Sequence, residues 1–159
     1  MTSEITRDSD KGEISILGRR HAIVDLQALL RHLETLVGSQ VAEVIIRSLE
    51  TRLGRDDATR IRKENPNKTI QEIIESLTES DRVCGFGLTQ VTLPQDDAGK
   101  AQLEVKNPYL KDNVPAKLLH FAWWAGVLSG LLDKEFEIGD VNFDESSNSM
   151  RGQFVPRQK

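Results

Sequence analysis

The strongest constraint on the fold is an apolar run over residues 118–132, which only His120 and Ser129 interrupt. A helix with this composition is apolar on every face, so other elements must cover it on every face. At 1.5 Å per residue the run spans about 22 Å, short of the roughly 30 Å hydrocarbon core of a bilayer. We therefore expect a buried helix over residues 115–133, with Pro115 in its first turn, and no membrane span.

The composition suits one hydrophobic core around this helix. A chain of 159 residues with 38% hydrophobic and 29% charged side chains is typical of a globular domain. Residues 1–80 hold 12 basic and 14 acidic side chains, and residues 81–159 hold 9 and 11. Because a nucleic-acid-binding surface needs an excess of positive charge, we expect no nucleic-acid partner.

The N-terminus and the single cysteine bear on the location of the protein. Residues 1–12 are polar and acidic without an apolar core, which is not the pattern of a secretory signal. Cys84 is the only cysteine, so neither an intrachain disulfide nor a multi-cysteine zinc site can form. We expect a flexible tail over residues 1–19, a single domain over residues 20–156, and a reducing, cytoplasmic location.

Three amphipathic helices are predicted before residue 85. Apolar residues recur at three- and four-residue steps over residues 24–37, which predicts a helix that ends at Gly38. A second helix begins at Ser39, and we expect Gly54 to end it, with one or two further turns over residues 55–63. The apolar side of this second helix consists of Val41, Val44, Ile45, Leu49 and Leu53.

The third helix begins with a capping box. In this motif the side chains of Thr69 and Glu72 each accept a hydrogen bond from a free backbone amide of the first turn. The apolar side of the helix that follows consists of Ile70, Ile73, Ile74 and Leu77.

Two pairs of strands are predicted from alternating patterns. Residues 86–93 and 101–106 alternate apolar and polar positions around a polar loop, as in an antiparallel hairpin. Residues 135–144 and 148–155 form a second hairpin, in which we expect Gly139 and Asp140 to make a bulge. The predicted class is α+β, with N-terminal helices and an antiparallel sheet of two hairpins flanking a long buried apolar helix.

The long helix and the hairpin after it also carry a family resemblance. Gly126 and Gly130 form a glycine-xxx-glycine pattern, followed by a short acidic stretch and two strands that end in an aromatic residue, Phe154. In these features residues 20–156 resemble the small-molecule-binding domains named after 4-vinyl reductase. The resemblance implies the NO signalling/Golgi transport ligand-binding fold, which is shared with small TRAPP vesicle-tethering subunits and with ligand-sensing domains of bacterial phenol-responsive activators.

One departure from the family limits what the resemblance implies. Many members carry cysteines near the start of the last helix and in the final hairpin, where this chain has none, so no metal or thiol role follows. His120 lies near the first of these places, but a single imidazole cannot hold a metal ion. His21, His32 and His120 are too far apart in sequence for a helical metal site, and we expect neither a metal nor a cofactor.

Two further candidates have a structural interpretation that is favoured over a functional one. Arg82 would lower the pKa of the Cys84 thiol if the two side chains met, but an inert, buried thiol is favoured. A basic cluster alternates with acidic residues, so a solvated helix face is favoured over a phosphate site. This cluster consists of Arg55, Arg60, Arg62 and Lys63.

The favoured hypothesis is non-enzymatic binding of a small apolar molecule in a sensor, carrier or assembly role. The resemblance implies an aromatic, lipid-like or tetrapyrrole ligand, while the chain has no nucleotide fingerprint and no convincing acid–base pair for catalysis. Desolvation would drive binding in an apolar cavity between the long helix and the sheet. Its predicted lining is Phe86, Leu103, Phe121, Trp124 and Leu128.

The alternative hypothesis is a dimeric interaction or adaptor subunit of a larger assembly, without a ligand. Its surface would be the two N-terminal helices, or the long helix where two glycines leave a notch beside a tryptophan. We assign Trp123, Gly126 and Gly130 to an interface or to close packing. A homodimer is expected under either hypothesis, with other protein partners under the second.

Overall fold

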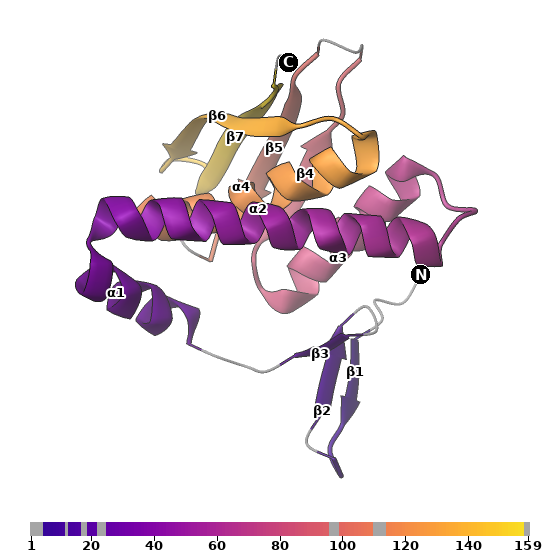
Figure 1. The fold of residues 1–159 in the computed structure, drawn as a ribbon, viewed down its shortest axis with the longest axis horizontal. Helices are drawn as coiled ribbons and strands as arrows, with labels where there is room; N and C mark the ends of the chain where they lie inside the picture. The colour runs from indigo at the N-terminus through magenta and orange to yellow at the C-terminus, as the bar shows by residue number, and fades with distance from the viewer. Residues whose placement is uncertain are drawn as a thin grey trace.

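The computed structural model describes residues 5–11, 13–16, 19–21, 25–95, 99–109 and 114–157. Within these residues, four helices and a four-stranded antiparallel sheet form the body of the molecule (Figure 1). The predicted α+β class is confirmed, with N-terminal helices and two hairpins around a buried helix. The helices are α1 (Leu26–Val37), α2 (Ser39–Glu64), α3 (Ile70–Cys84) and α4 (Val114–Leu132), and the strands are β4 (Leu88–Thr92), β5 (Ala101–Lys106), β6 (Phe136–Asp144) and β7 (Ser149–Pro156).

The sheet joins the two hairpins side by side, in the order β4-β5-β7-β6. Alternate residues of β5 are buried, as the period of two predicts. In the register between β5 and β7, Leu103 lies opposite Gly152. The register between β6 and β7 shifts between Ile138 and Val141, so the predicted bulge is confirmed.

Helix α4 lies between the sheet and α2, and contacts both at close range. On the sheet side, a Cβ atom on Gly152 would lie 2.4 Å from the Phe121 ring, so only glycine leaves room for this ring. On the α2 side, a Cβ atom on Gly126 would lie 1.9 Å from the backbone oxygen of Thr51. The apolar helix is thus covered on both sides by elements of its own chain.

Helix α2 does not end at Gly54, so this predicted boundary is wrong. The helix continues to Glu64, and Gly54 lies buried inside it. A Cβ atom at this position would lie 2.0 Å from the backbone oxygen of Trp123. A glycine within a helix costs about 1 kcal/mol relative to alanine, but here it allows the backbones of α2 and α4 to touch.

The predicted apolar side of α2 is also wrong, because α2 has two such sides. Val41, Val44 and Leu49, which we expected in the core, are exposed. The side that faces the core instead consists of Ala42, Ile46, Gly54, Ala58 and Ile61, and its small residues Gly54 and Ala58 let α2 approach α4 closely. The helical period identifies both sides and does not say which one the chain itself covers.

The other helices follow their sequence signals. The capping box of α3 is confirmed, since Glu72 N donates to Thr69 Oγ1 and Thr69 N donates to Glu72 Oε2. The predicted apolar side of this helix faces the core. Helix α1 begins after Asp25, whose side chain accepts a hydrogen bond from Ala28 N, and ends at Gly38. Residues 22–24, 96–98 and 110–113, where other predicted boundaries and loops fall, lie outside the described residues.

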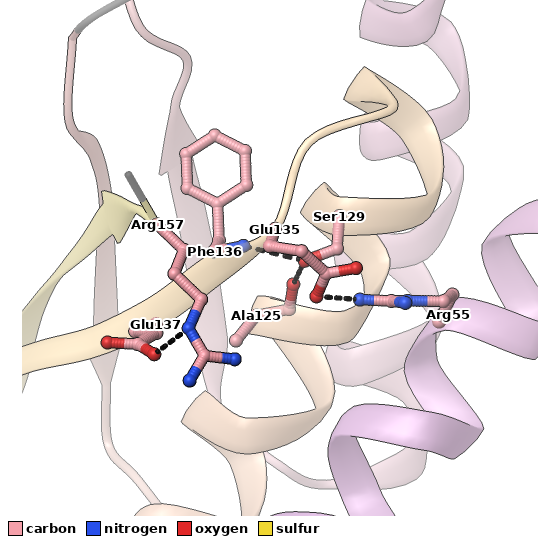
Figure 2. Close-up of polar contacts among 7 residues, drawn as sticks. All are labelled: Arg55, Ala125, Ser129, Glu135, Phe136, Glu137 and Arg157. Atoms are coloured by element: carbon pink, nitrogen blue, oxygen red, sulfur yellow. Dashed lines mark hydrogen bonds and ion pairs between the residues drawn. The ribbon is translucent and has the colours of Figure 1, made fainter. Parts of the chain in front are cut away.

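Ser129, one of two residues that interrupt the apolar run, ties α4 to β6 (Figure 2). Its hydroxyl donates to the Ala125 oxygen at 2.7 Å and accepts from Phe136 N at 2.9 Å. Figure 2 also shows the Arg55 side chain of α2 paired with Glu135, just before β6. The polar interruption in the helix therefore has a structural role, because it satisfies the first amide of the strand.

The N-terminal segment contains three short strands, of which the first two fall within the tail predicted over residues 1–19 and the third begins at its end. β1 (Ile5–Asp8), β2 (Glu13–Ile16) and β3 (Arg19–His21) form a separate antiparallel sheet in that order. This sheet lies apart from the four-stranded sheet in Figure 1. The flexibility of residues 1–19 stays a prediction, but their strand content was not expected from such short, polar stretches.

Candidate functional site

The structure places four of the five predicted pocket residues in one packed core. Leu103 of β5 and the three residues of α4, Phe121, Trp124 and Leu128, are at most 1% exposed and belong to the same hydrophobic cluster. Phe86, which precedes β4, is half-buried and packs instead against a smaller cluster. The core of this smaller cluster consists of Leu30, Ile46 and Leu119.

A group of polar side chains from four elements meets between these two hydrophobic clusters. We call it the Asp81 cluster, and define it as Glu50 of α2, Asp81 of α3, Thr89 of β4, and His120 and Trp124 of α4. Asp81 is 5% exposed. A buried carboxylate is costly unless hydrogen bonds and charges stabilise it, so its partners are of interest.

One oxygen of Asp81 contacts both aromatic nitrogens of the cluster. Trp124 Nε1 donates to Asp81 Oδ2 at 2.9 Å, and His120 Nε2 lies 3.2 Å from the same oxygen. Thr89 Oγ1 lies 3.3 Å from His120 Nε2. The carboxylate therefore fixes the orientation of an indole and an imidazole that are both part of α4.

Glu50 adds a carboxyl group with an unusual protonation equilibrium. Burial raises the pKa of Glu50 from 4.5 to about 7, while the neighbouring His120 lowers it and Asp57 raises it by smaller amounts. A group that titrates near neutral pH inside a protein is a common feature of functional sites. The cluster thus combines a buried carboxylate, an imidazole and a carboxyl group that gains and loses its proton near pH 7.

Phe86 forms the apolar wall of the cluster. Its ring stacks on the His120 ring, with centroids 5.4 Å apart and planes 17° apart. Its backbone nitrogen donates to the backbone carbonyl oxygen of Asp81 at 2.9 Å. Gly85 and Gly87 flank it with φ angles of 82° and 122°, values that non-glycine residues rarely adopt. Chemically, the arrangement offers a flat apolar surface beside hydrogen-bonding groups, which is typical of small-molecule sites.

The residues assigned to an interface or to close packing lie against α2 of the same chain. Gly126 and Gly130 face Thr51, Arg55 and Ala58 of α2. Trp123 is half-buried, and its Nε1 donates to Asp57 Oδ2 at 3.4 Å. The notch that the glycines leave in α4 is therefore filled by α2.

Cys84 is exposed, so the expectation of a buried thiol is wrong. Partial desolvation, and to a smaller extent the charge of Asp81, raise the pKa of the Cys84 thiol. Arg82 does not lower it, because its guanidinium pairs with Glu79 at 2.8 Å and 2.5 Å. The thiol thus lacks the positive environment of a reactive cysteine.

The other candidate sites are occupied by ion pairs or lack a cluster of ligands. The arginines of the basic cluster pair with carboxylates, as on a solvated helix face: Arg55 with Glu135, Arg60 with Asp57 and Glu64, and Arg62 with Asp133. His32 is exposed on α1, and the side chain of His21 lies outside the described residues. Among the side chains that the structure describes, no three histidine, cysteine or acidic groups gather as metal ligands.

Of the helices in the described part of the chain, none combines the length and the hydropathy needed to cross a bilayer.

Sequence reasoning missed Asp81 and Glu50, the two carboxyl groups of the cluster. A signal for Asp81 was present, because it follows Leu77 by four residues and so continues the apolar side of α3. Glu50 follows Ile46 by four residues on the inward side of α2, a side that the sequence pattern did not select.

Comparisons with known proteins identify the fold. No family model matches the chain, and no curated protein matches it in sequence. The crystal structure of the phenol-responsive sensory domain of the transcription activator PoxR with phenol matches with a TM-score of 0.75 and 12% identity, over 96% of this chain and 84% of that chain. Subunit 3 of a trafficking protein particle complex from Naegleria fowleri, covalently bound to palmitic acid, matches with a TM-score of 0.42 and 13% identity, over 83% and 95%. The chain has the fold of the PoxR sensory domain, as the family resemblance implied.

Proposed function

We propose that this chain binds a small apolar or aromatic molecule in a non-catalytic role, as a sensor or carrier. The observation that supports this most directly is the buried Asp81 carboxylate, which orients Trp124 and His120 within an apolar environment. Ligand sites of this kind combine mostly apolar walls with a few well-placed polar groups. The fold shared with a phenol-responsive sensory domain supports the same proposal.

The proposed site lies where Phe86 covers His120. Of the five predicted lining residues, Phe86 is the one that is half-buried rather than enclosed in the core. Its two flanking glycines have the backbone freedom that a displacement of this ring requires. We propose that the ligand ring takes the place of Phe86 on the imidazole face, next to the core residues Leu103, Phe121, Trp124 and Leu128.

The chemistry of the cluster specifies a ligand with an apolar body and one hydrogen-bonding group. Removal of the apolar body from water provides the driving force. A hydroxyl or carboxyl group on the ligand would hydrogen-bond within the Asp81 cluster, because a buried polar group without a partner is costly. On this basis we also propose that the chain is a distant member of the 4-vinyl reductase-type domains.

Tryptophan fluorescence tests the proposal, because only Trp124 hydrogen-bonds to Asp81, while Trp123 meets its ring edge-on with the centroids 5.3 Å apart. Trp123→Phe retains only Trp124, which contacts Asp81, and Trp124→Phe retains only Trp123, which contacts Asp57. We expect phenol, palmitic acid or protoporphyrin to change the emission of the Trp123→Phe variant in a saturable way. The Trp124→Phe variant should respond much less.

Asp81→Asn is the variant that links binding to the cluster. It should weaken binding about 10-fold, which corresponds to the loss of one hydrogen bond of about 1.4 kcal/mol. Asp56→Asn, at an exposed position of α2, is the matched control and should leave affinity unchanged. The proposed site is wrong if none of the three probes produces a saturable change. It is also wrong if Asp81→Asn and Asp56→Asn bind the probe equally well.

A second candidate role is that of an interaction subunit without a ligand. One observation favours it, namely that α1 and α2 expose large apolar side chains on the side away from α4. Clusters of this kind on a protein surface mark sites of association. The two roles are compatible, because the Asp81 cluster and this surface lie on different sides of α2.

A further inference from the structure

We infer that Glu50 and Asp81 select the charge of the ligand, so that the Asp81 cluster binds an uncharged hydrogen-bond donor and excludes a carboxylate. This inference rests on the proposed function and specifies the chemical class of the ligand at the same site. It separates the two polar groups proposed for the ligand, a hydroxyl and a carboxyl group. The charges and the hydrogen-bonding groups of the cluster decide between them.

The Asp81 cluster contains more acidic groups than basic ones. Its two carboxyl groups belong to Glu50 and Asp81, and its one imidazole belongs to His120, while Thr89 is uncharged. The side chains of Asp81 and His120 are 7% and 12% exposed, so water screens their charges weakly. If both carboxyl groups are ionised, the cluster has a net negative charge whether His120 is protonated or neutral.

The arginines nearest to the cluster on α2 and α3 pair with other carboxylates. On α2, Arg60 pairs with Asp57 at 3.7 Å and with Glu64 at 2.8 Å. On α3, Arg82 pairs with Glu79 at 2.5 Å. The residues that α1 contributes to the adjacent hydrophobic cluster are leucines. These neighbours therefore leave the negative charge of the Asp81 cluster uncompensated.

The protonation of Glu50 reflects the response of this environment to negative charge. Burial raises the pKa of Glu50 from 4.5 to about 7, while His120 lowers it and Asp57 raises it by smaller amounts. An ionised ligand group would add another negative charge beside Asp81, and like charges that share a buried site repel each other. The cluster therefore disfavours an anionic ligand most strongly above about pH 7, where Glu50 is ionised.

The hydrogen-bonding groups of the cluster lead to the same ligand class. A carboxylate only accepts hydrogen bonds, and Asp81 Oδ2 accepts one from Trp124 Nε1 at 2.9 Å. A carboxylate on the ligand would meet Asp81 without a hydrogen that either group can donate. An O–H or N–H group on the ligand donates to such an oxygen, and bonds of this kind are about twice as strong as those between neutral groups. The ligand group is therefore a hydroxyl or an amide.

The aromatic ring beside the cluster defines the body of the ligand. Phe86 stacks on the His120 ring with the centroids 5.4 Å apart and an angle of 17° between the planes. An aromatic ligand ring that replaces Phe86 keeps this stacking and removes its own surface from water. The inferred ligand is thus an aromatic ring with one uncharged donor group attached.

Benzamide and benzoate test the inference, because they have nearly the same shape and differ in charge and in donor groups. Isothermal titration calorimetry of the full chain at pH 8 measures both affinities while Glu50 is mainly ionised. Benzamide should bind, and benzoate should bind at least about 10-fold more weakly. At pH 6 benzoate is still ionised but Glu50 is mainly protonated, so benzoate should bind more tightly than at pH 8 and benzamide should not.

Glu50→Gln tests whether this residue makes the selection. The substitution removes a carboxyl group and keeps the size of the side chain, so at pH 8 the ratio of the benzamide affinity to the benzoate affinity should fall about 5-fold. Glu75→Gln, at an exposed position of α3, is the matched control and should keep the wild-type ratio. Far-UV circular dichroism should be the same for both variants, which separates a change in selection from a loss of the fold.

The outcomes distinguish a failure of the inference from a failure of the proposed function. If benzoate binds as tightly as benzamide at pH 8, or if Glu50→Gln keeps the wild-type ratio, the inference is wrong and the proposed function stands. If neither compound binds, the inference is wrong as well. The proposed function fails with it only if phenol, palmitic acid and protoporphyrin also leave the tryptophan emission unchanged.

Discussion

The two sides of α2 are both apolar, yet they have different roles in the molecule. The inward side presents Gly54 and Ala58, and its backbone touches that of α4. The outward side presents Val41, Val44 and Leu49 to solvent. The comparison teaches that the close contact with α4 depends on small residues at particular positions, because Gly54 and Ala58 let the α2 backbone reach α4. The other side stays exposed to solvent.

The largest effect is expected where the inward side meets α4. Gly126→Ala would place a Cβ atom 1.9 Å from the Thr51 backbone oxygen, so the helices must separate or the chain must not fold. We expect a loss of at least about 3 kcal/mol in the free energy of unfolding, measured by urea denaturation. Gly139→Ala is the control, because its Cβ would meet no atom closer than 3.3 Å. Equal stability of the two variants would remove the basis of the comparison.

The next largest effect on stability is expected in the Asp81 cluster. Asp81→Ala leaves Trp124 Nε1 and His120 without their buried acceptor. We expect a loss of about 2 to 4 kcal/mol in the free energy of unfolding, because buried groups lose their hydrogen-bond partners. Asp81→Asn keeps an acceptor and should lose less, which chemical denaturation of both variants would show. A smaller loss for alanine than for asparagine would contradict the hydrogen-bonding role of Asp81.

Glu50 predicts a pH dependence of stability. Its pKa in the folded state is raised from 4.5 to about 7, so the folded state holds the proton more tightly than the unfolded state. The stabilisation is therefore fully present below pH 4.5 and is lost as the pH rises through about 7. The loss should be on the order of 2 kcal/mol. Denaturation between pH 4.5 and 8 should show this slope in the wild-type chain and not in Glu50→Gln.

Substitutions on the outward side should hardly change the stability of the monomer. Val41→Ser removes an apolar side chain that is already 51% exposed. Measured at a concentration where the chain is monomeric, the free energy of unfolding should change by less than about 0.5 kcal/mol. The same measurement at high concentration should show a larger loss, because dimerisation stabilises the folded state. A large loss at low concentration would mean that the outward side belongs to the core of the monomer.

The smallest effect is expected at the turn between β6 and β7, far from α2 in the fold. Hydrogen bonds from Ser146 and Ser147 lower the pKa of Asp144 from 3.8 to about 2. Its contribution to stability is present above pH 3.8 and is lost as the pH falls through about 2, opposite in sign to that of Glu50. Acid denaturation of Asp144→Asn should show a shallower slope between pH 4 and 2 than the wild-type chain.

The sequence predicted the elements better than their contacts. The capping box at Thr69, the alternation of β5 and the bulge after Ile138 are local patterns, and each is confirmed. The continuity of α2 through Gly54 was not predictable, because the reason for that glycine is the Trp123 backbone, 69 residues later. Local rules assign a glycine in a helix to its end, and only tertiary packing reverses this assignment.

The candidate site shows the same limit. His120 and Trp124 were singled out from the sequence, His120 as an interruption of the apolar run and Trp124 as a large aromatic residue, whereas Asp81 and Glu50 were not singled out. The site forms because α2, α3 and α4 bring these residues together from three distant segments. Residue type alone gives no sign that a carboxylate will be buried, since most are exposed.

Native mass spectrometry of the freshly purified full chain tests most directly the claim that one side of α2 supports a ligand-binding core while the other binds a second copy. The account predicts an ion with twice the 17.9 kDa chain mass that also carries an additional small-molecule mass. The two masses should change independently. Val44→Glu should abolish the dimer ion but retain the bound small molecule, and Asp81→Ala should reduce the fraction of chains that carry the small molecule. A bare single chain at all concentrations would contradict the account.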